Sequence, residues 1–322
     1  MSVWITANIL LNLITMINSI LTILICLFIL ILIVKFHRKS RSVPLLLAGH
    51  TCSTLLISAF MLASMATVSL FGYMGIPLEQ HANTIWCRWR GFFIHGFLCA
   101  LYDSYILQAA YRLCRVVFYR RKHLHSFPLY SLLVPTESLF GVVSISPVLL
   151  RDDVIYLPNE YYCQTPFTNI PAITYIAIRL FLLPLLFIAL VYVCLLRHVR
   201  RRNSSSTTTT TTMSNSNCRR TKQNTRDLIV IRRLLLMLGV LILLGLPSII
   251  FLSILIITGY HIPVTYRIGW LSVSFSLVFL AYMLIQLTSP LRKTVRRIFR
   301  RDSPDRNRNN LSHEQQQPLT KI

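Results

Sequence analysis

The chain has 322 residues, of which 54% are hydrophobic and only 13% are charged, and its formal net charge at pH 7 is +23. Soluble domains carry about 25% charged residues, so this composition indicates a membrane protein. Such a cationic excess would suggest nucleic-acid binding in a soluble protein, but here the cations lie between apolar segments, which argues against a nucleic-acid partner. The eight cysteines form no Cys-x-x-Cys or Cys/His spacing typical of zinc sites, and we expect no metal and no cofactor.

Seven apolar segments are long enough to cross a bilayer as helices, which takes about 20 residues each. They lack period-two alternation and exceed the roughly 10 residues of a barrel strand, so a transmembrane barrel is not favoured. The first segment has no basic residue before Lys35, unlike a cleavable signal peptide, and we expect it to be retained. We therefore predict an all-α membrane protein, a bundle of seven transmembrane helices. The predicted segments are Ile9–Val34, Val43–Phe71, Arg90–Val117, Phe127–Leu149, Ile170–Leu196, Leu228–Ile257 and Tyr266–Leu287.

The distribution of lysine and arginine predicts the orientation of this bundle. With the N-terminus outside, 28 of the 33 cations fall in the inner loops and tail, and only four fall in the outer loops. Cytoplasmic segments of membrane proteins are enriched in these residues. We therefore predict an outer N-terminus, an inner C-terminus and a multi-pass protein of the plasma membrane.

The remaining segments differ from the bundle in composition. The threonine-rich inner loop at 203–218 and the tail at 302–322 have little apolar surface to bury, so we expect both to be disordered. Residues 292–301 alternate cations with apolar side chains at helical spacing, which predicts a short amphipathic helix bound to the anionic lipid of the inner leaflet. The predicted organisation also includes a short extracellular arm at 1–8 and a transmembrane domain at 9–291.

The third segment carries a cysteine at its outer end and an arginine at its inner end. Twenty-five residues separate Cys87 from Arg112, which is roughly 37 Å of helix against a hydrocarbon core of about 30 Å. The two residues are therefore expected near opposite faces of the membrane. A second cysteine, Cys163, falls on the same outer side as Cys87.

The fifth and sixth segments add to this pattern. Pro184 precedes Tyr192 by eight residues, and Pro247 follows Asp227 by twenty. Together with the two outer cysteines and the arginine of the third segment, these residues resemble the rhodopsin-like (class A) G-protein-coupled receptors, of which the chain would be a divergent member.

The resemblance implies a disulfide between Cys87 and Cys163 that restrains the second outer loop, with two free thiols as the alternative. It also implies that Arg112 pairs with Asp227 and that breaking this pair lets the sixth helix move outward. The alternatives are a membrane-flanking Arg112, a solvated Asp227 and a Tyr192 that belongs only to the interfacial aromatic belt. The residues assigned in this way to an activation switch are Arg112, Tyr111, Asp227, Tyr192, Pro184 and Pro247.

The resemblance further implies binding regions at both ends of the bundle. An extracellular ligand, either a peptide or a small molecule, would bind at the outer end, and a heterotrimeric G protein would meet the cationic inner loops. Arrestin is a further candidate partner because the inner Ser/Thr tract can accept phosphate. The candidate pocket residues are Ile94, His95 and Arg179. The candidate G-protein contacts are Arg115, Arg120, Arg121, Arg232 and Arg233.

Several positions depart from the family pattern. Tyr111 replaces the usual acid before the arginine, and Thr51 replaces the sodium-binding aspartate. Gly245-Leu246-Pro247 lacks the usual tryptophan, and the seventh segment lacks Asn-Pro-x-x-Tyr. These departures leave open a degenerate receptor that does not couple to a G protein.

The ionisable residues Asp103, Glu137 and Arg179 fall inside predicted membrane segments. Such residues are functional candidates by default. Hydrogen bonds between helices are the alternative for the two acids, whereas Arg179 could reach an acid in the pocket. A transporter or channel would need ionisable pairs along a path and internal repeats, and the sequence shows no repeat. We expect no enzyme, because Gly-x-Ser-x-Gly and His-Glu-x-x-His motifs are absent.

Overall fold

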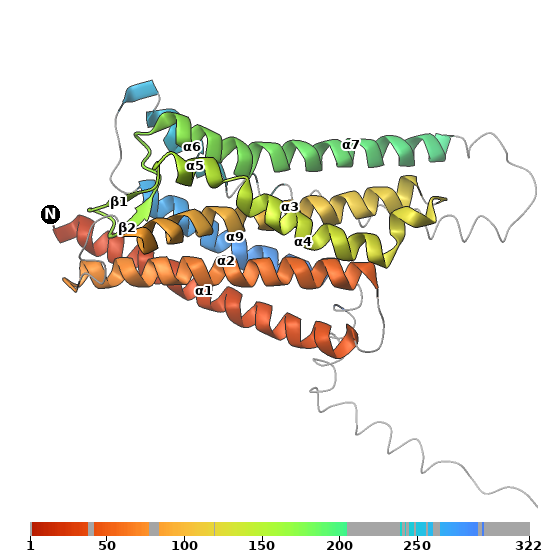
Figure 1. Ribbon diagram of the computed structural model, residues 1–322, viewed down its shortest axis with the longest axis horizontal. Helices are drawn as coiled ribbons and strands as arrows, with labels where there is room; N and C mark the ends of the chain where they lie inside the picture. Colours follow the sequence, from red (N-terminus) through yellow and green to blue (C-terminus); the bar gives the residue numbers. More distant parts are fainter. Residues whose placement is uncertain are drawn as a thin grey trace, which may run out of the picture.

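The computed structural model places long helices side by side along one axis, with a small hairpin at the end where the chain begins (Figure 1). The structure describes residues 2–37, 42–76, 84–118, 120–204, 239, 242, 245–247, 249–255, 257–259, 265–288 and 292.

The described helices and strands follow one another in a simple order. The α-helices are α1 (Ser2–His37), α2 (Val43–Tyr73), α3 (Ile85–Val117), α4 (Phe127–Val143), α5 (Ser146–Leu150), α6 (Ile170–Ala177), α7 (Leu183–Ser204) and α9 (Thr265–Leu287). A 3-10 turn, η1 (Lys122–His125), precedes α4, and a π-helical turn, η2 (Ile178–Leu182), joins α6 to α7. The strands β1 (Ile155–Leu157) and β2 (Tyr162–Gln164) pair antiparallel.

Five helical stretches are long and apolar enough to cross a membrane, so the chain is a predominantly helical, multi-pass membrane protein. These stretches are Ile5–Lys35, Val43–Tyr73, Phe127–Leu150, Ile170–His198 and Thr265–Gln286. Helix α3 has 33 residues but is less apolar, because it carries Asp103, Gln108 and several arginines. The membrane character is thereby confirmed, while the count of seven spans and the outer N-terminus stay predictions.

Four predicted segments lie largely outside the described residues. The predicted sixth span, Leu228–Ile257, is described only in part, and its described residues at 245–247 and 249–255 are helical. The loop at 203–218, the amphipathic helix at 292–301 and the tail at 302–322 lie outside them almost entirely.

Local chemistry explains where the helices begin and break. The side chain of Thr84 accepts a hydrogen bond from the backbone N–H of Cys87, which caps α3. The predicted fourth span divides into α4 and α5 ahead of Pro147, which stands in the first turn of α5. The π-helical turn ends two residues before Pro184, whose ring nitrogen cannot donate the hydrogen bond that an α-helix would direct to the carbonyl of Leu180.

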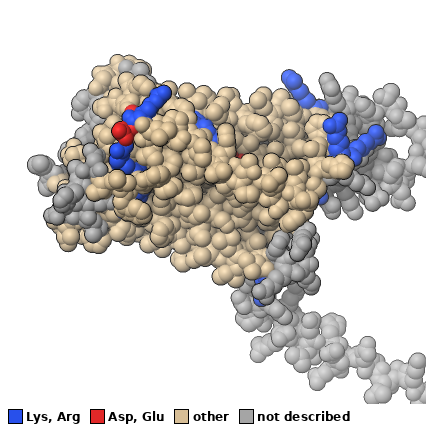
Figure 2. All heavy atoms as spheres, in the orientation of Figure 1, with Lys and Arg blue, Asp and Glu red and all other residues tan. Residues whose placement is uncertain are grey.

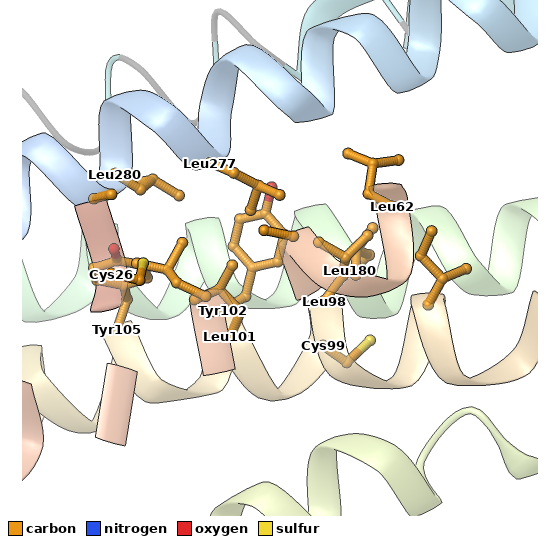
Figure 3. Close-up of a cluster of buried hydrophobic side chains, with 14 of the residues drawn as sticks. Cys26, Leu62, Leu98, Cys99, Leu101, Tyr102, Tyr105, Leu180, Leu277 and Leu280 are labelled. Carbon is orange, nitrogen blue, oxygen red and sulfur yellow. The ribbon is translucent and has the colours of Figure 1, made fainter. Parts of the chain in front are cut away.

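Helix α3 lies at the centre of the bundle, in contact with α2, α4, α7 and the hairpin, while α1 packs against α2 and α9. The contact between α3 and α4 is close, since a Cβ built on Gly141 would lie 2.6 Å from the Cα of Ala100. Figure 3 shows part of a buried cluster that joins helices far apart in the sequence. Its labelled members are Cys26 of α1, Leu62 of α2, Leu98, Cys99, Leu101, Tyr102 and Tyr105 of α3, Leu180 of η2, and Leu277 and Leu280 of α9.

Candidate functional site

The hairpin of β1 and β2 is fastened to the first turn of α3. A disulfide joins Cys87 of α3 to Cys163 of β2, with 5.4 Å between their Cα atoms, as the resemblance implies. One turn further along α3, a Cβ built on Gly91 would lie 2.5 Å from the carbonyl oxygen of Cys163. Glycine at this position therefore lets the hairpin lie directly on the helix.

A buried arginine of α9, Arg267, holds the hairpin from the other side. Its guanidinium donates hydrogen bonds to Asn12 Oδ1 of α1 at 2.7 Å and to Ser69 Oγ of α2 at 2.6 Å. It also donates to the main-chain oxygen of Glu160 at 2.9 Å, and it lies 2.5 Å from the carboxylate of the same residue. One side chain thus connects α1, α2 and α9 to the turn between the two strands.

Glu160 has an unusual environment for an acid near a chain turn. Only 4% of Glu160 and 2% of Arg267 are exposed. Desolvation by burial is the largest effect and raises the pKa of Glu160 to about 7, although the nearby Arg267 opposes this increase. The acid therefore changes charge near neutral pH.

The sequence analysis did not predict this pair. One signal was present: Arg267 is the second residue of the predicted seventh span, Tyr266–Leu287, where an unpaired cation is costly. Nothing local in the sequence pairs it with Glu160, which lies 107 positions away.

Of the predicted pocket residues, Ile94 and His95 lie in the interior beneath the hairpin, and both are buried. His95 Nδ1 is 2.8 Å from the carbonyl of Gly91, and its ring contacts Trp270 of α9 edge-on at 5.7 Å between centroids. Trp270 in turn donates its Nε1–H to Gln164 Oε1 of β2 at 2.9 Å. His95 is therefore connected to the hairpin through one aromatic side chain.

The third predicted pocket residue, Arg179, is paired within the bundle. Its guanidinium on η2 forms two hydrogen bonds with the carboxylate of Asp103 on α3, one of them 3.1 Å long. Its Nε–H donates to Ser144 Oγ between α4 and α5 at 2.9 Å, and the ring of Phe140 lies 5.2 Å away. The acid that Arg179 reaches is thus on α3, and both members of the pair are 7% exposed.

Two further polar contacts connect α2 to α4 and α3. His50 Nε2 lies 2.6 Å from Glu137 Oε2 of α4. The next residue of α2, Thr51, accepts a hydrogen bond from Gln108 Nε2 of α3 at 2.6 Å. The three intramembrane ionisable residues singled out in the sequence all therefore make contacts between helices.

The opposite end of α3 holds two of the predicted switch residues, Tyr111 and Arg112. Arg112 is half-buried in the last turns of the helix. Tyr111 is buried and contacts Tyr130 of α4 edge-on, at 5.0 Å between ring centroids. Tyr192 is half-buried on α7, Pro184 is buried near the start of that helix, and Pro247 lies in a helical stretch. Asp227 lies outside the described residues.

Cations gather at this end of the molecule, where α3 and α7 finish (Figure 2). Arg115, Arg120 and Arg121 are exposed there, and the last two line an open hollow with His123 and Leu124. The two remaining predicted G-protein contacts, Arg232 and Arg233, lie outside the described residues.

Comparison with known proteins does not assign the chain to a family: no protein-family model matches it, and no curated protein matches it.

Proposed function

We propose that this protein is a rhodopsin-like G-protein-coupled receptor of the plasma membrane. It would bind an extracellular ligand at the end that carries the hairpin, and would activate a heterotrimeric G protein at the end that carries the exposed arginines. This proposal includes seven spans, an outer N-terminus and no enzymatic activity.

The observation that carries the proposal is the arrangement along α3. The disulfide from Cys87 to Cys163 sets the hairpin over one end of the bundle, and Arg112 lies 25 residues further along the same helix, at the opposite end. At 1.5 Å per residue the two positions are about 37 Å apart, enough to place them on opposite sides of a bilayer. A restrained lid at one end and a basic surface at the other are what a transmembrane receptor needs.

In the proposed mechanism, Arg112 pairs with Asp227 in the resting state, and separation of the two lets the sixth helix move away from α3. A ligand favours the separated state only to the extent that it binds that state more tightly. Tyr192, Pro184 and Pro247 would adjust the helices around this movement. The exposed Arg115, Arg120 and Arg121 would then contact the G protein, together with Arg232 and Arg233.

Ligand-free signalling tests the proposal directly. In cells that carry a panel of G-protein activation reporters, we expect basal coupling to at least one G protein. Arg112→Ala is expected to reduce this coupling to background, because it removes the cation of the proposed switch. Asp227→Ala is expected to raise the coupling, because it removes the acid that is proposed to restrain Arg112.

Lys35→Ala is the matched control, since Lys35 is an exposed cation at the same end of the bundle, on α1. It should leave the signal near that of the wild type at equal surface expression. Silence of surface-expressed wild type and of all variants on every reporter would contradict receptor function and leave a non-coupling, degenerate receptor.

A transporter or channel is the second candidate, favoured by one specific observation. The pairs Asp103–Arg179 and His50–Glu137 place ionisable groups between helices inside the bundle, as a substrate or proton path requires. Proton or ion flux into proteoliposomes that is lost in Glu137→Gln would favour this candidate. Absence of such flux, with G-protein coupling present, would favour the receptor.

A further inference from the structure

The turn between β1 and β2 is held against the bundle by a small number of strong contacts. Glu160 inserts its side chain toward Arg267, whose guanidinium also lies over the rings of Tyr73 and Tyr162, at 5.3 and 5.2 Å from their centroids. The main-chain oxygen of Glu160 accepts a second hydrogen bond, from Ser69 Oγ at 2.8 Å. Without this acid the turn would keep main-chain contacts to the bundle but would lose its only ion pair among the described residues.

The same turn contains a strained backbone. Tyr161 has a φ of 60°, in the left-handed region that is unfavourable for a bulky residue. Its ring packs on Gly72 of α2, where a Cβ would lie 2.2 Å from the Tyr161 ring, and it contacts Tyr73 edge-on. A conformation of this kind persists only while surrounding contacts compensate for it, and the packing of Tyr161 against Gly72 and Tyr73 is among them.

The groups that face Glu160 determine what can titrate here. From α9 they are Arg267 and Tyr266, from α2 Tyr73, and from the hairpin Tyr161 and Tyr162, while α1 contributes the neutral Asn12 to Arg267. Tyrosine hydroxyls have an ordinary pKa of about 10 and arginine stays charged. Among these described neighbours, Glu160 is thus the group whose charge changes between pH 5 and 8.

We propose that Glu160 is a proton-binding site that couples the pH on the hairpin side of the membrane to how firmly the hairpin is seated on the bundle. If the chain is the receptor proposed above, extracellular protons are a ligand that acts through this hairpin, and this part of the inference rests on the proposed function.

Thermodynamic linkage gives the direction of the effect. Burial raises the pKa of Glu160 to about 7 while the hairpin is seated, and a hairpin lifted into water would return it to its ordinary value of 4.5. The seated form therefore binds the proton more tightly, so acid favours seating. The free-energy advantage that protonation of Glu160 gives the seated hairpin is complete below about pH 4.5. It is lost as the pH rises toward 7, and it changes little above that value.

Hydrogen–deuterium exchange of the hairpin amides at 155–164 tests this inference in the purified full-length protein in lipid nanodiscs. Rates are measured at pH 5, 6, 7 and 8 and divided by the intrinsic rate at each pH. In the wild type, we expect protection to fall by up to about tenfold per pH unit between pH 5 and 7 and then to level off. In Glu160→Gln, protection should be independent of pH. Corrected wild-type protection that is constant from pH 5 to 8 would overturn the inference without any variant.

Asp153→Asn is the matched control, because Asp153 precedes the hairpin and accepts a hydrogen bond from Asn169 Nδ2 at 2.6 Å instead of facing Arg267. It should retain the wild-type pH dependence. A pH dependence that persists in Glu160→Gln, or that vanishes in Asp153→Asn, would contradict the assignment to Glu160.

A signalling measurement separates this inference from the receptor proposal. Basal reporter activity should differ between external pH 6 and pH 8 in the wild type and not in Glu160→Gln. If hairpin protection depends on pH while every reporter stays silent, the proton site is supported and the receptor proposal is contradicted. If reporters respond to the switch variants while hairpin protection ignores pH, the receptor is supported and the proton site is overturned.

Discussion

Replacing Arg179 with leucine is expected to destabilise the protein by about 3–5 kcal/mol, because it leaves the carboxylate of Asp103 buried without its counter-ion. The double replacement Asp103→Leu with Arg179→Leu should recover most of this loss. Removing both partners eliminates the desolvation penalty together with the attraction, and a buried ion pair replaced by apolar groups is often nearly neutral.

The free energies of unfolding of wild type, both single variants and the double variant, from SDS titration in mixed micelles, give the coupling energy of the pair. Arg197→Leu is the control, since Arg197 is an exposed cation further along the same helical region and should tolerate the change. Additive effects of the two single replacements would show that the pair does not act as a unit. A stable Arg179→Leu variant would mean that Asp103 is protonated or finds another partner.

Replacing Gly141 with alanine is expected to destabilise the bundle by about 1–3 kcal/mol, although alanine is the better helix former. The added Cβ would lie 2.6 Å from the Cα and 2.7 Å from the N of Ala100. Those are backbone atoms of the central helix and cannot move aside as a side chain can, so α3 and α4 would have to separate. The separation would also disturb the Arg179–Ser144 contact, which lies just beyond the end of α4.

Gly96→Ala supplies a matched control at the same interface. Its Cβ would meet Val142 at 3.4 Å, which is close to ordinary van der Waals contact. We expect its free energy of unfolding to stay within about 1 kcal/mol of that of the wild type, since a gain in helix propensity offsets a small steric cost. Equal effects of the two replacements would show that the spacing between α3 and α4 is not set by Gly141.

Much of the architecture follows from local patterns. Long apolar runs favour helices, because a helix satisfies its backbone hydrogen bonds within one segment of the chain inside a bilayer. The predicted second, third and seventh segments match α2, α3 and α9 closely. The break within the fourth segment was not predicted. It depends on how the chain passes Pro147, and apolarity carries no information about such a break.

The amino-acid sequence by itself determined the membrane class, the approximate helix positions and the residues whose charge is costly in a membrane, because apolarity and charge are local properties. Only the tertiary structure decided which of these charges meet. Arg179 was expected to reach an acid, and that acid is Asp103 on α3. Glu160 and Arg267 are buried together, although they lie 107 positions apart in the chain. These pairings depend on helix rotation and on the path of the hairpin, which are fixed by packing between residues far apart in the chain.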